Sequence, residues 1–105
     1  MLLLLCCLRK IRNMKESGLE RKVKKRIEEI GGMCLKWTSP GFTGVPDRIA
    51  FLPGGRIVFI ELKAPGKGDA RSPRQKRVAA QLQDLGADVI VIDSLEELDE
   101  HLRTL

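Results

Sequence analysis

The stretch Arg56-Ile57-Val58-Phe59-Ile60-Glu61-Leu62-Lys63 decides the fold of this chain, because it carries the strongest strand signal in the sequence. Side chains of a strand point alternately to opposite faces, so the odd-numbered residues share one face and the even-numbered residues share the other. The carboxylate of Glu61 and the ammonium group of Lys63 therefore lie side by side at the end of an otherwise apolar face. Because buried charges are costly without partners, we expect a compensating group nearby.

The preceding apolar run, which opens at Asp47, supplies that group. Pro53-Gly54-Gly55 separates the two runs, as in a β-hairpin. A turn of the two glycines alone would set Asp47 opposite Leu62, on the wrong face. A three-residue loop, with its last glycine in a left-handed conformation, sets Asp47 opposite Glu61. We predict the three-residue loop, or an equivalent bulge, and therefore two converging carboxylates.

Hydrophobic periodicity and turn residues divide the rest of the chain. One helix has an apolar stripe of Leu19, Val23, Ile27 and Ile30. A second helix, capped by Ser72, carries inward Val78, Leu82 and Leu85. The predicted elements are a helix over 19–30, strands over 33–38, 47–52 and 56–63, a helix over 73–85, a strand over 88–92 and a helix from 95 onward. The order α-β-β-β-α-β-α predicts one α/β domain, whose strand–helix–strand unit should be parallel.

Composition restricts the class of protein. The 105 residues leave room for one core, and 43% hydrophobic with 31% charged residues is typical of a soluble globular domain. Lys and Arg outnumber Asp and Glu by 19 to 14, and a formal charge of +5 favours a polyanionic partner, with nucleic acid first. Three cysteines and one histidine predict neither a disulfide framework nor a zinc site, and they fit a reducing cytoplasm.

The N-terminal segment 1–14 is predicted to be a leader or a poorly defined segment outside the working domain. Its first eight residues hold five leucines and two adjacent cysteines. They are too few to span a bilayer, so no membrane partner is expected, although they could serve packing or dimerisation. Met14 would serve as an alternative start. Residues 15–105 are then the single domain.

Two carboxylates converging from neighbouring strands suit Mg²⁺, which prefers oxygen ligands and keeps several waters. The main-chain carbonyl of Leu62 is a plausible further ligand. Such a metal would polarise a phosphodiester oxygen and lower the pKa of an attacking water. Lys63 lies close to the carboxylates, which keep it protonated, so we expect it to orient that water and stabilise charge rather than act as a simple base.

Two segments carry a resemblance to a known family: Gly44-Val45-Pro46-Asp47-Arg48, and Phe59-Ile60-Glu61-Leu62-Lys63-Ala64-Pro65-Gly66. They resemble the PD-(D/E)XK nuclease superfamily and, within it, the virus-type replication-repair nuclease (VRR-NUC) domains. A bare D…ExK match is weak, but the glycine-rich approach to Asp47, the hairpin and the Ser72-Pro73-Arg74-Gln75 helix start strengthen it. The resemblance runs from about Lys15 onward.

The resemblance implies a restriction-endonuclease-like fold with a mixed central sheet flanked by helices. It also implies phosphodiester hydrolysis with Mg²⁺ or Mn²⁺ and no small-molecule cofactor. Asp47 and Glu61 would be metal ligands, Lys63 the catalytic lysine, and Glu20 and Gln75 supporting site residues. Stand-alone, virus-like members imply a homodimer that cuts branched DNA such as four-way (Holliday) junctions. A phage- or bacterium-encoded enzyme acting in the host cytoplasm and in DNA repair would fit.

Glu20 and Gln75 each have a structural alternative. Both stand three residues after a serine, Ser17 and Ser72, and so could complete capping boxes that only start helices. Glu20 lies seven residues before Ile27 and borders the inward stripe, so it could also reach the outer shell of the metal. Gln75 can serve both roles only if its helix starts at the cleft.

Basic residues are the candidate DNA contacts. Those expected to hold phosphates by charge, without reading sequence, are Lys36, Arg48, Lys67, Arg71, Arg74, Lys76 and Arg77. Lys36 is nearly as well explained as a solvated strand residue, and the bases of the first helix as a solvated face. Trp37 and Phe42 are expected to pack. Stacking on an unpaired base is the alternative, which 4% aromatic content does not support.

The sequence thus predicts a Mg²⁺-dependent, structure-selective DNA endonuclease. The closer rival is the same chemistry with another cutting mode, such as a nickase, an exonuclease or a restriction-type enzyme. The more distant rival is a nucleic-acid-binding module that has lost catalysis. Competent residues at Asp47, Glu61 and Lys63 argue against the second rival, and the lack of room for a recognition domain argues against sequence-specific cutting.

Overall fold

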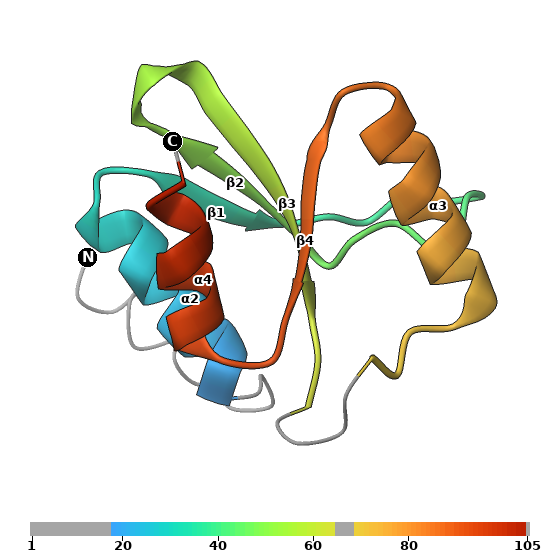
Figure 1. Ribbon diagram of the computed structural model, residues 1–105, viewed down its shortest axis with the longest axis horizontal. Helices are drawn as coiled ribbons and strands as arrows, with labels where there is room; N and C mark the ends of the chain where they lie inside the picture. Colours follow the sequence, from blue (N-terminus) through green and yellow to red (C-terminus); the bar gives the residue numbers. More distant parts are fainter. Residues whose placement is uncertain (1–17, 65–68, 105) are drawn as a thin grey trace, which may run out of the picture.

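The computed structural model describes residues 18–64 and 69–104, and the predicted leader and Lys67 lie outside this part of the chain. Four strands form one sheet in the order β1-β2-β3-β4. Figure 1 shows α2 and α4 together on one side of this sheet and α3 on the other. The elements are α2 (Gly18–Glu29), β1 (Met33–Lys36), β2 (Arg48–Leu52), β3 (Arg56–Leu62), α3 (Pro73–Asp84), β4 (Asp88–Ile92) and α4 (Leu95–Leu102). The predicted order α-β-β-β-α-β-α is confirmed.

The hairpin between β2 and β3 has the predicted three-residue connection. Leu52 pairs with Arg56 and Arg48 pairs with Ile60, so the connection is Pro53–Gly55. Gly54 and Gly55 have φ values of 84° and 80°, a left-handed region that glycine enters without steric cost. Continued by one pair, this register sets Asp47 opposite Glu61.

The sheet is mixed, as expected. β1 and β2 pair antiparallel, as do β2 and β3, whereas β3 and β4 pair parallel. The parallel pairing follows from α3, which carries the chain back across the sheet between these two strands (Figure 1). The ends of β2 and β3 that bear Asp47 and Glu61 thus lie beside the chain that enters α3.

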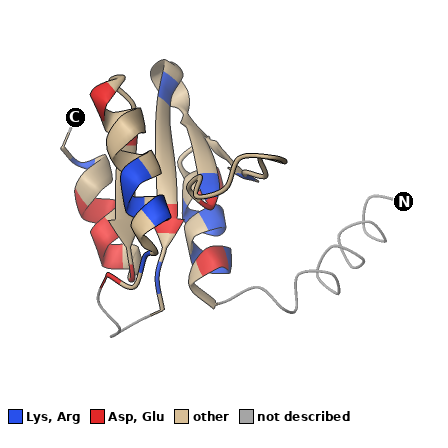
Figure 2. Ribbon diagram, turned by 90° about the vertical axis from the view of Figure 1, so that its right-hand side faces the viewer, with Lys and Arg blue, Asp and Glu red and all other residues tan. Residues whose placement is uncertain are grey.

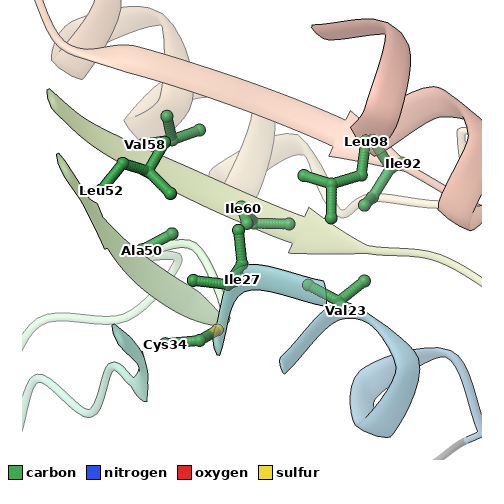
Figure 3. Close-up of a cluster of buried hydrophobic side chains, with 9 residues drawn as sticks. All are labelled: Val23, Ile27, Cys34, Ala50, Leu52, Val58, Ile60, Ile92 and Leu98. Atoms are coloured by element: carbon green, nitrogen blue, oxygen red, sulfur yellow. The ribbon is translucent and has the colours of Figure 1, made fainter. Parts of the chain in front are cut away.

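The core lies between the sheet and the pair α2 and α4. Val23 and Ile27 of α2, Val58 and Ile60 of β3 and Leu98 of α4 are fully buried, and Figure 3 shows the cluster they form. An ion pair between Arg26 of α2 and Asp99 of α4 joins the two helices at its margin. Burial of these branched side chains stabilises the fold in proportion to the apolar area removed from water.

Two predicted core positions are wrong. Ile30 is 44% exposed and Leu85 is 85% exposed. Each lies just beyond the end of its helix, after Glu29 and after Asp84, so helical periodicity no longer governs where its side chain points. The first three residues of the α2 stripe pack as predicted: Val23 and Ile27 are buried, and Leu19 packs against the core.

The opposite face of the sheet is only partly covered. Met33, Phe51 and Ile57 pair across β1, β2 and β3 and are 57%, 41% and 43% exposed. Leu35, two residues after Met33 on the same face of β1, is 47% exposed. This row of four apolar side chains lies on the α3 side of the sheet. Within the described part of the chain, no helix is long and apolar enough to cross a membrane.

Candidate active site

Asp47 and Glu61 come together where β2 begins and β3 ends. The Asp47 Oδ2 atom accepts a hydrogen bond of 2.8 Å from the main-chain N–H of Leu62. The main-chain carbonyl of Asp47 accepts another of 2.9 Å from Trp37, which follows β1. These contacts hold the aspartate at the junction of three strands. Glu61 is 2% exposed, so its carboxyl group is buried beside Asp47 as the register requires.

Gln75 connects α3 to this pair of carboxyl groups. Its Oε1 atom accepts a hydrogen bond of 2.8 Å from the N–H of Ser72, and its own N–H donates one of 3.1 Å to the Ser72 hydroxyl, which completes a capping box. Its Nε2 atom donates a hydrogen bond of 3.1 Å to Glu61 Oε1. One side chain therefore starts the helix and contacts the site, because α3 begins at the cleft.

The loop before Asp47 packs closely on α3 through Gly44. Gly44 has a φ of 91°, and a Cβ there would lie 2.9 Å from Arg74 Cγ and 3.1 Å from Val78 Cγ2. Arg74 also donates hydrogen bonds to the Thr43 carbonyl and hydroxyl oxygens, at 3.1 and 2.6 Å. Glycine is thus required at this approach. The contact fixes the glycine-rich loop, and with it the position of Asp47, against the helix that carries Gln75.

The electrostatics of the site fit a divalent cation. Burial, then hydrogen bonding with Asp47 and the negative charge of Asp47, raise the pKa of Glu61 to about 8, while Lys63 and Arg71 act to lower it. Two adjacent carboxylates in a buried place repel each other, and a cation between them would remove that cost. Residues 18–64 and 69–104 contain no group of three or more acidic, histidine or cysteine side chains arranged around a metal. The oxygen donors available here are two carboxyl groups and main-chain carbonyls, a set that would suit Mg²⁺ with several bound waters.

Lys63 lies two residues after Glu61, just past the end of β3, and borders a cavity next to the site. Its main-chain N–H donates a 2.9 Å hydrogen bond to the carbonyl of Ile92, which extends the β3–β4 pairing past Leu62. The cavity is about 780 Å³, and its lining includes Lys63, Leu62 and Glu20. Glu20 of α2 thus lies on the same cavity as the lysine. The capping alternative for Glu20 involves Ser17, outside the described residues.

Arg48 does not lie where a DNA-contacting residue must. Its side chain is 6% exposed, and its guanidinium group lies 3.5 Å from the Glu20 carboxylate, which is 28% exposed. It points to the α2 side of the sheet, with Ala50 and Leu52, because side chains alternate along β2. A phosphate cannot reach a buried guanidinium group, so the prediction that Arg48 binds DNA is corrected. Arg48 holds Glu20 instead.

The other described basic candidates are on the surface, in three settings. Lys36 is exposed at the end of β1. Arg71 is largely covered and donates hydrogen bonds of 2.8 Å to both carboxylate oxygens of Asp69, and these bonds hold the pKa of Asp69 below its usual range. Exposed side chains on α3 are Arg74, Lys76 and Arg77. Figure 2 shows basic residues on α3 and acidic residues on α4, and α3 is the helix whose Gln75 contacts Glu61.

Comparisons with known proteins agree with this geometry. The chain is 44% identical over 84 residues to "Putative nuclease p44" of Acyrthosiphon pisum secondary endosymbiont phage 1, which covers 80% of this chain and 88% of that protein. It is also similar to a solved VRR-NUC domain, with a TM-score of 0.75 and 29% identity over 82% of this chain and 91% of the other. The chain belongs to the VRR-NUC family. No protein-family model matches it.

As a VRR-NUC domain, the chain has the restriction-endonuclease-like fold that its sequence predicted. The structure brings together Asp47, Glu61, Lys63 and Gln75, and it places Glu20 on the adjoining cavity. Sequence reasoning missed the pair of Glu20 and Arg48. The signal was present, since alternation from Asp47 turns Arg48 toward the apolar stripe of α2, beside which Glu20 stands.

Proposed function

We propose that this VRR-NUC protein is a Mg²⁺-dependent DNA endonuclease whose site is formed by Asp47, Glu61 and Lys63. The observation that carries the proposal is that the carboxyl group of Glu61 is buried next to that of Asp47, which raises the pKa of Glu61. The positive charge of Lys63, two residues later, acts on the same carboxyl group. A structural ion pair would need one carboxylate for one lysine. The second carboxylate is unfavourable without a cation, and an oxygen-rich cation site is what phosphodiester hydrolysis uses.

Each residue has a role that its contacts support. The carboxylates of Asp47 and Glu61, with the carbonyl of Leu62, would hold Mg²⁺, for which Mn²⁺ could substitute. A metal held there would supply Lewis-acid activation of a phosphodiester oxygen and of an attacking water. Lys63 would orient that water and stabilise the developing charge. Gln75 fixes the orientation of Glu61 through its 3.1 Å hydrogen bond. Glu20, held by Arg48, lines the cavity as an outer group.

The proposed substrate is branched DNA, such as a four-way junction. Phosphates would be held by charge alone at Lys36, Lys67, Arg71, Arg74, Lys76 and Arg77. Two identical sites in a symmetric dimer suit a symmetric branched substrate. A phage protein among the relatives supports action in the cytoplasm of a host cell.

A homodimer is proposed because a chain of 105 residues buries a smaller fraction of its surface than a larger domain does, and it leaves the apolar row Met33, Leu35, Phe51 and Ile57 exposed. A second copy would cover this row. We expect sedimentation analysis to give a dimer for the wild type and a monomer for Ile57→Glu, which places a charge in the middle of the row. If the Ile57→Glu variant were still a dimer, the interface would not include this apolar row.

The decisive experiment is cleavage of a labelled four-way junction, with and without Mg²⁺, by the wild type, Lys63→Ala and Lys25→Ala. Lys25 is an exposed lysine of α2 and serves as the matched control. Paired, symmetric cuts by the wild type and Lys25→Ala, lost in Lys63→Ala and in EDTA, would support a dimeric junction-cutting enzyme. Equal cutting of linear duplex would keep the metal site and remove the junction preference. Binding without cleavage in Mg²⁺ and Mn²⁺ would favour a silent DNA-binding module.

A further inference from the structure

An aromatic groove runs along α3 away from the candidate active site. Its near part is a cavity of about 510 Å³ lined by Gln75, Arg74 and the glycine-rich loop. Its far part is a cavity of about 530 Å³ that extends along the helix to Leu82 and Leu85. Both cavities are lined by Trp37, Ser39, Phe42 and Val45, so the two adjoin each other along these residues. We call them together the aromatic groove.

We propose that the aromatic groove binds an unpaired nucleobase of the DNA strand whose phosphate lies at the Asp47–Glu61 site. The inference rests on the proposed function and deepens it, because it names the feature of the substrate that the enzyme selects. A base that has left the helical stack needs an aromatic or apolar surface for its face and cations for its flanking phosphates. The groove offers both.

The groove is connected to the active site by direct contacts. The Phe42 ring lies 5.1 Å from the Arg74 guanidinium carbon, in a cation–π arrangement. Gln75, the next residue, donates its 3.1 Å hydrogen bond to Glu61. A nucleotide whose base lies against Phe42 would therefore have its phosphate beside Arg74 and close to the carboxylates.

The surfaces that line the groove are unusual for a small folded domain. Phe42 is 45% exposed and Leu85 is 85% exposed, although both are large apolar residues. Trp37 lines the same cavity, and its ring centroid lies 5.3 Å from that of Phe59 on the sheet. The cavity thus offers apolar and aromatic surface beside the basic residues of α3. Apolar surface next to positive charge complements a base attached to its phosphates.

The sole tryptophan makes the groove directly measurable. The chain contains one tryptophan and no tyrosine, so its emission comes from Trp37. The probes are a blunt duplex and the same duplex with a short unpaired thymidine flap, each titrated with Ca²⁺ in place of Mg²⁺ to prevent cleavage. We expect the flapped duplex to quench Trp37 emission and to bind more tightly than the blunt duplex.

Three variants separate base contacts from phosphate contacts. Phe42→Ala should weaken binding of the flapped duplex relative to the blunt duplex by roughly 5- to 150-fold, the affinity that corresponds to one stacked base. Phe42→Trp keeps an aromatic face and should preserve the preference. Lys76→Ala removes an exposed charge on the same helix and should weaken both probes by the same factor, so the ratio of their Kd values stays constant.

The outcomes distinguish this proposal from the proposed nuclease function. An unchanged ratio of Kd values in Phe42→Ala overturns the base-binding groove, even if the protein cuts DNA. A selective loss together with no cleavage in Mg²⁺ or Mn²⁺ keeps the groove and overturns the nuclease. Conversion of a dimer into a monomer by Phe42→Ala, measured by sedimentation, would overturn the proposal by making the groove an interface between two copies.

Discussion

The two faces of the central sheet contrast sharply along a single strand. On the α2 and α4 side, β3 contributes Val58 and Ile60, both fully buried. On the α3 side, it contributes Ile57, which is 43% exposed, and then Glu61, which is 2% exposed among polar partners. The first face supplies the apolar burial that stabilises the fold. The second face carries the carboxyl groups and leaves apolar surface uncovered.

This difference shows how a small domain separates stability from chemistry. Alternation along a strand lets one residue anchor the core while its neighbour faces the cleft, so both tasks fit in seven residues of β3. Buried carboxyl groups weaken a fold, and the continuous core on the other face offsets that cost. Substitutions on the two faces should therefore have separable effects.

The largest expected effect is on the core face. Ile60→Ala should lower the free energy of unfolding by about 2–5 kcal/mol, because it opens a cavity in a packed core. Ile57→Ala, three residues earlier on the other face, should cost less than about 1 kcal/mol, because its side chain is already 43% exposed. Denaturant unfolding of both variants measures the difference. Equal losses would contradict the assignment of stability to one face.

The next largest effect is on the cleft face and concerns activity. Asp47→Asn keeps an oxygen that can accept from the Leu62 N–H, but it removes one of the two charges that would hold the metal. We expect cleavage to fall by about 100-fold or more, since even residues that only support metal ligands contribute 10- to 100-fold. Above pH 8, where both carboxyl groups are ionised, metal-free stability should not fall, because a repulsion is relieved. Glu100→Gln, an exposed change on α4, is the control.

Glu20 and Arg48 are an exception to this separation of the two faces, because they form a charged pair on the side of the sheet that holds the apolar core. Glu20→Gln removes a carboxylate that lies 3.5 Å from a guanidinium group that is 6% exposed, and it should lower the free energy of unfolding by roughly 1–3 kcal/mol. Glu28→Gln, at an exposed position of the same helix, should change it by less than about 0.5 kcal/mol. If the two variants changed the free energy of unfolding by similar amounts, the pair of Glu20 and Arg48 would have no structural role.

The last contrast concerns how the stability of the metal-free protein depends on pH. The pKa of Glu61 is raised from 4.5 to about 8, so between these values the folded state binds more protons than the unfolded state. Stability must then fall as pH rises, by up to about 1.4 kcal/mol per pH unit. Glu61→Gln has no such proton and should lack this contribution. The measurement is denaturant unfolding of the wild type and of Glu61→Gln in EDTA, at several pH values from 5.5 to 7.5. If the free energy of unfolding changed with pH by the same amount in both proteins, the raised pKa of Glu61 would be refuted.

The sequence was sufficient for features that depend on short-range rules. Alternation placed Glu61 and Lys63 on one face, and the length of the glycine turn placed Asp47 opposite Glu61. The serine and glutamine spacing predicted the start of α3, and the structure adds the contact from Gln75 to Glu61. These features need no knowledge of how distant elements pack.

The features that sequence reasoning missed depend on packing between distant elements. Leu85 has an apolar side chain at helical spacing, but nothing in the sequence reveals that it lies past the last turn of α3 and remains 85% exposed. Arg48 was assigned to DNA by its charge, whereas its position over α2 decides its partner. The aromatic groove likewise exists only because Gly44 lets the loop lie directly on α3.

The three-residue connection Pro53–Gly55 has a consequence for how this protein can diverge or be engineered. Tips of hairpins are exposed, as this one is, and they ordinarily accept insertions and deletions. Here the number of residues in the tip sets the register of the two strands, and that register places Asp47 opposite Glu61 at their other end. One residue more or less would shift every pair of the hairpin and turn Asp47 away from Glu61. The length of the tip is therefore constrained, its two glycines are favoured by their positive φ values, and fusion partners belong elsewhere on the molecule.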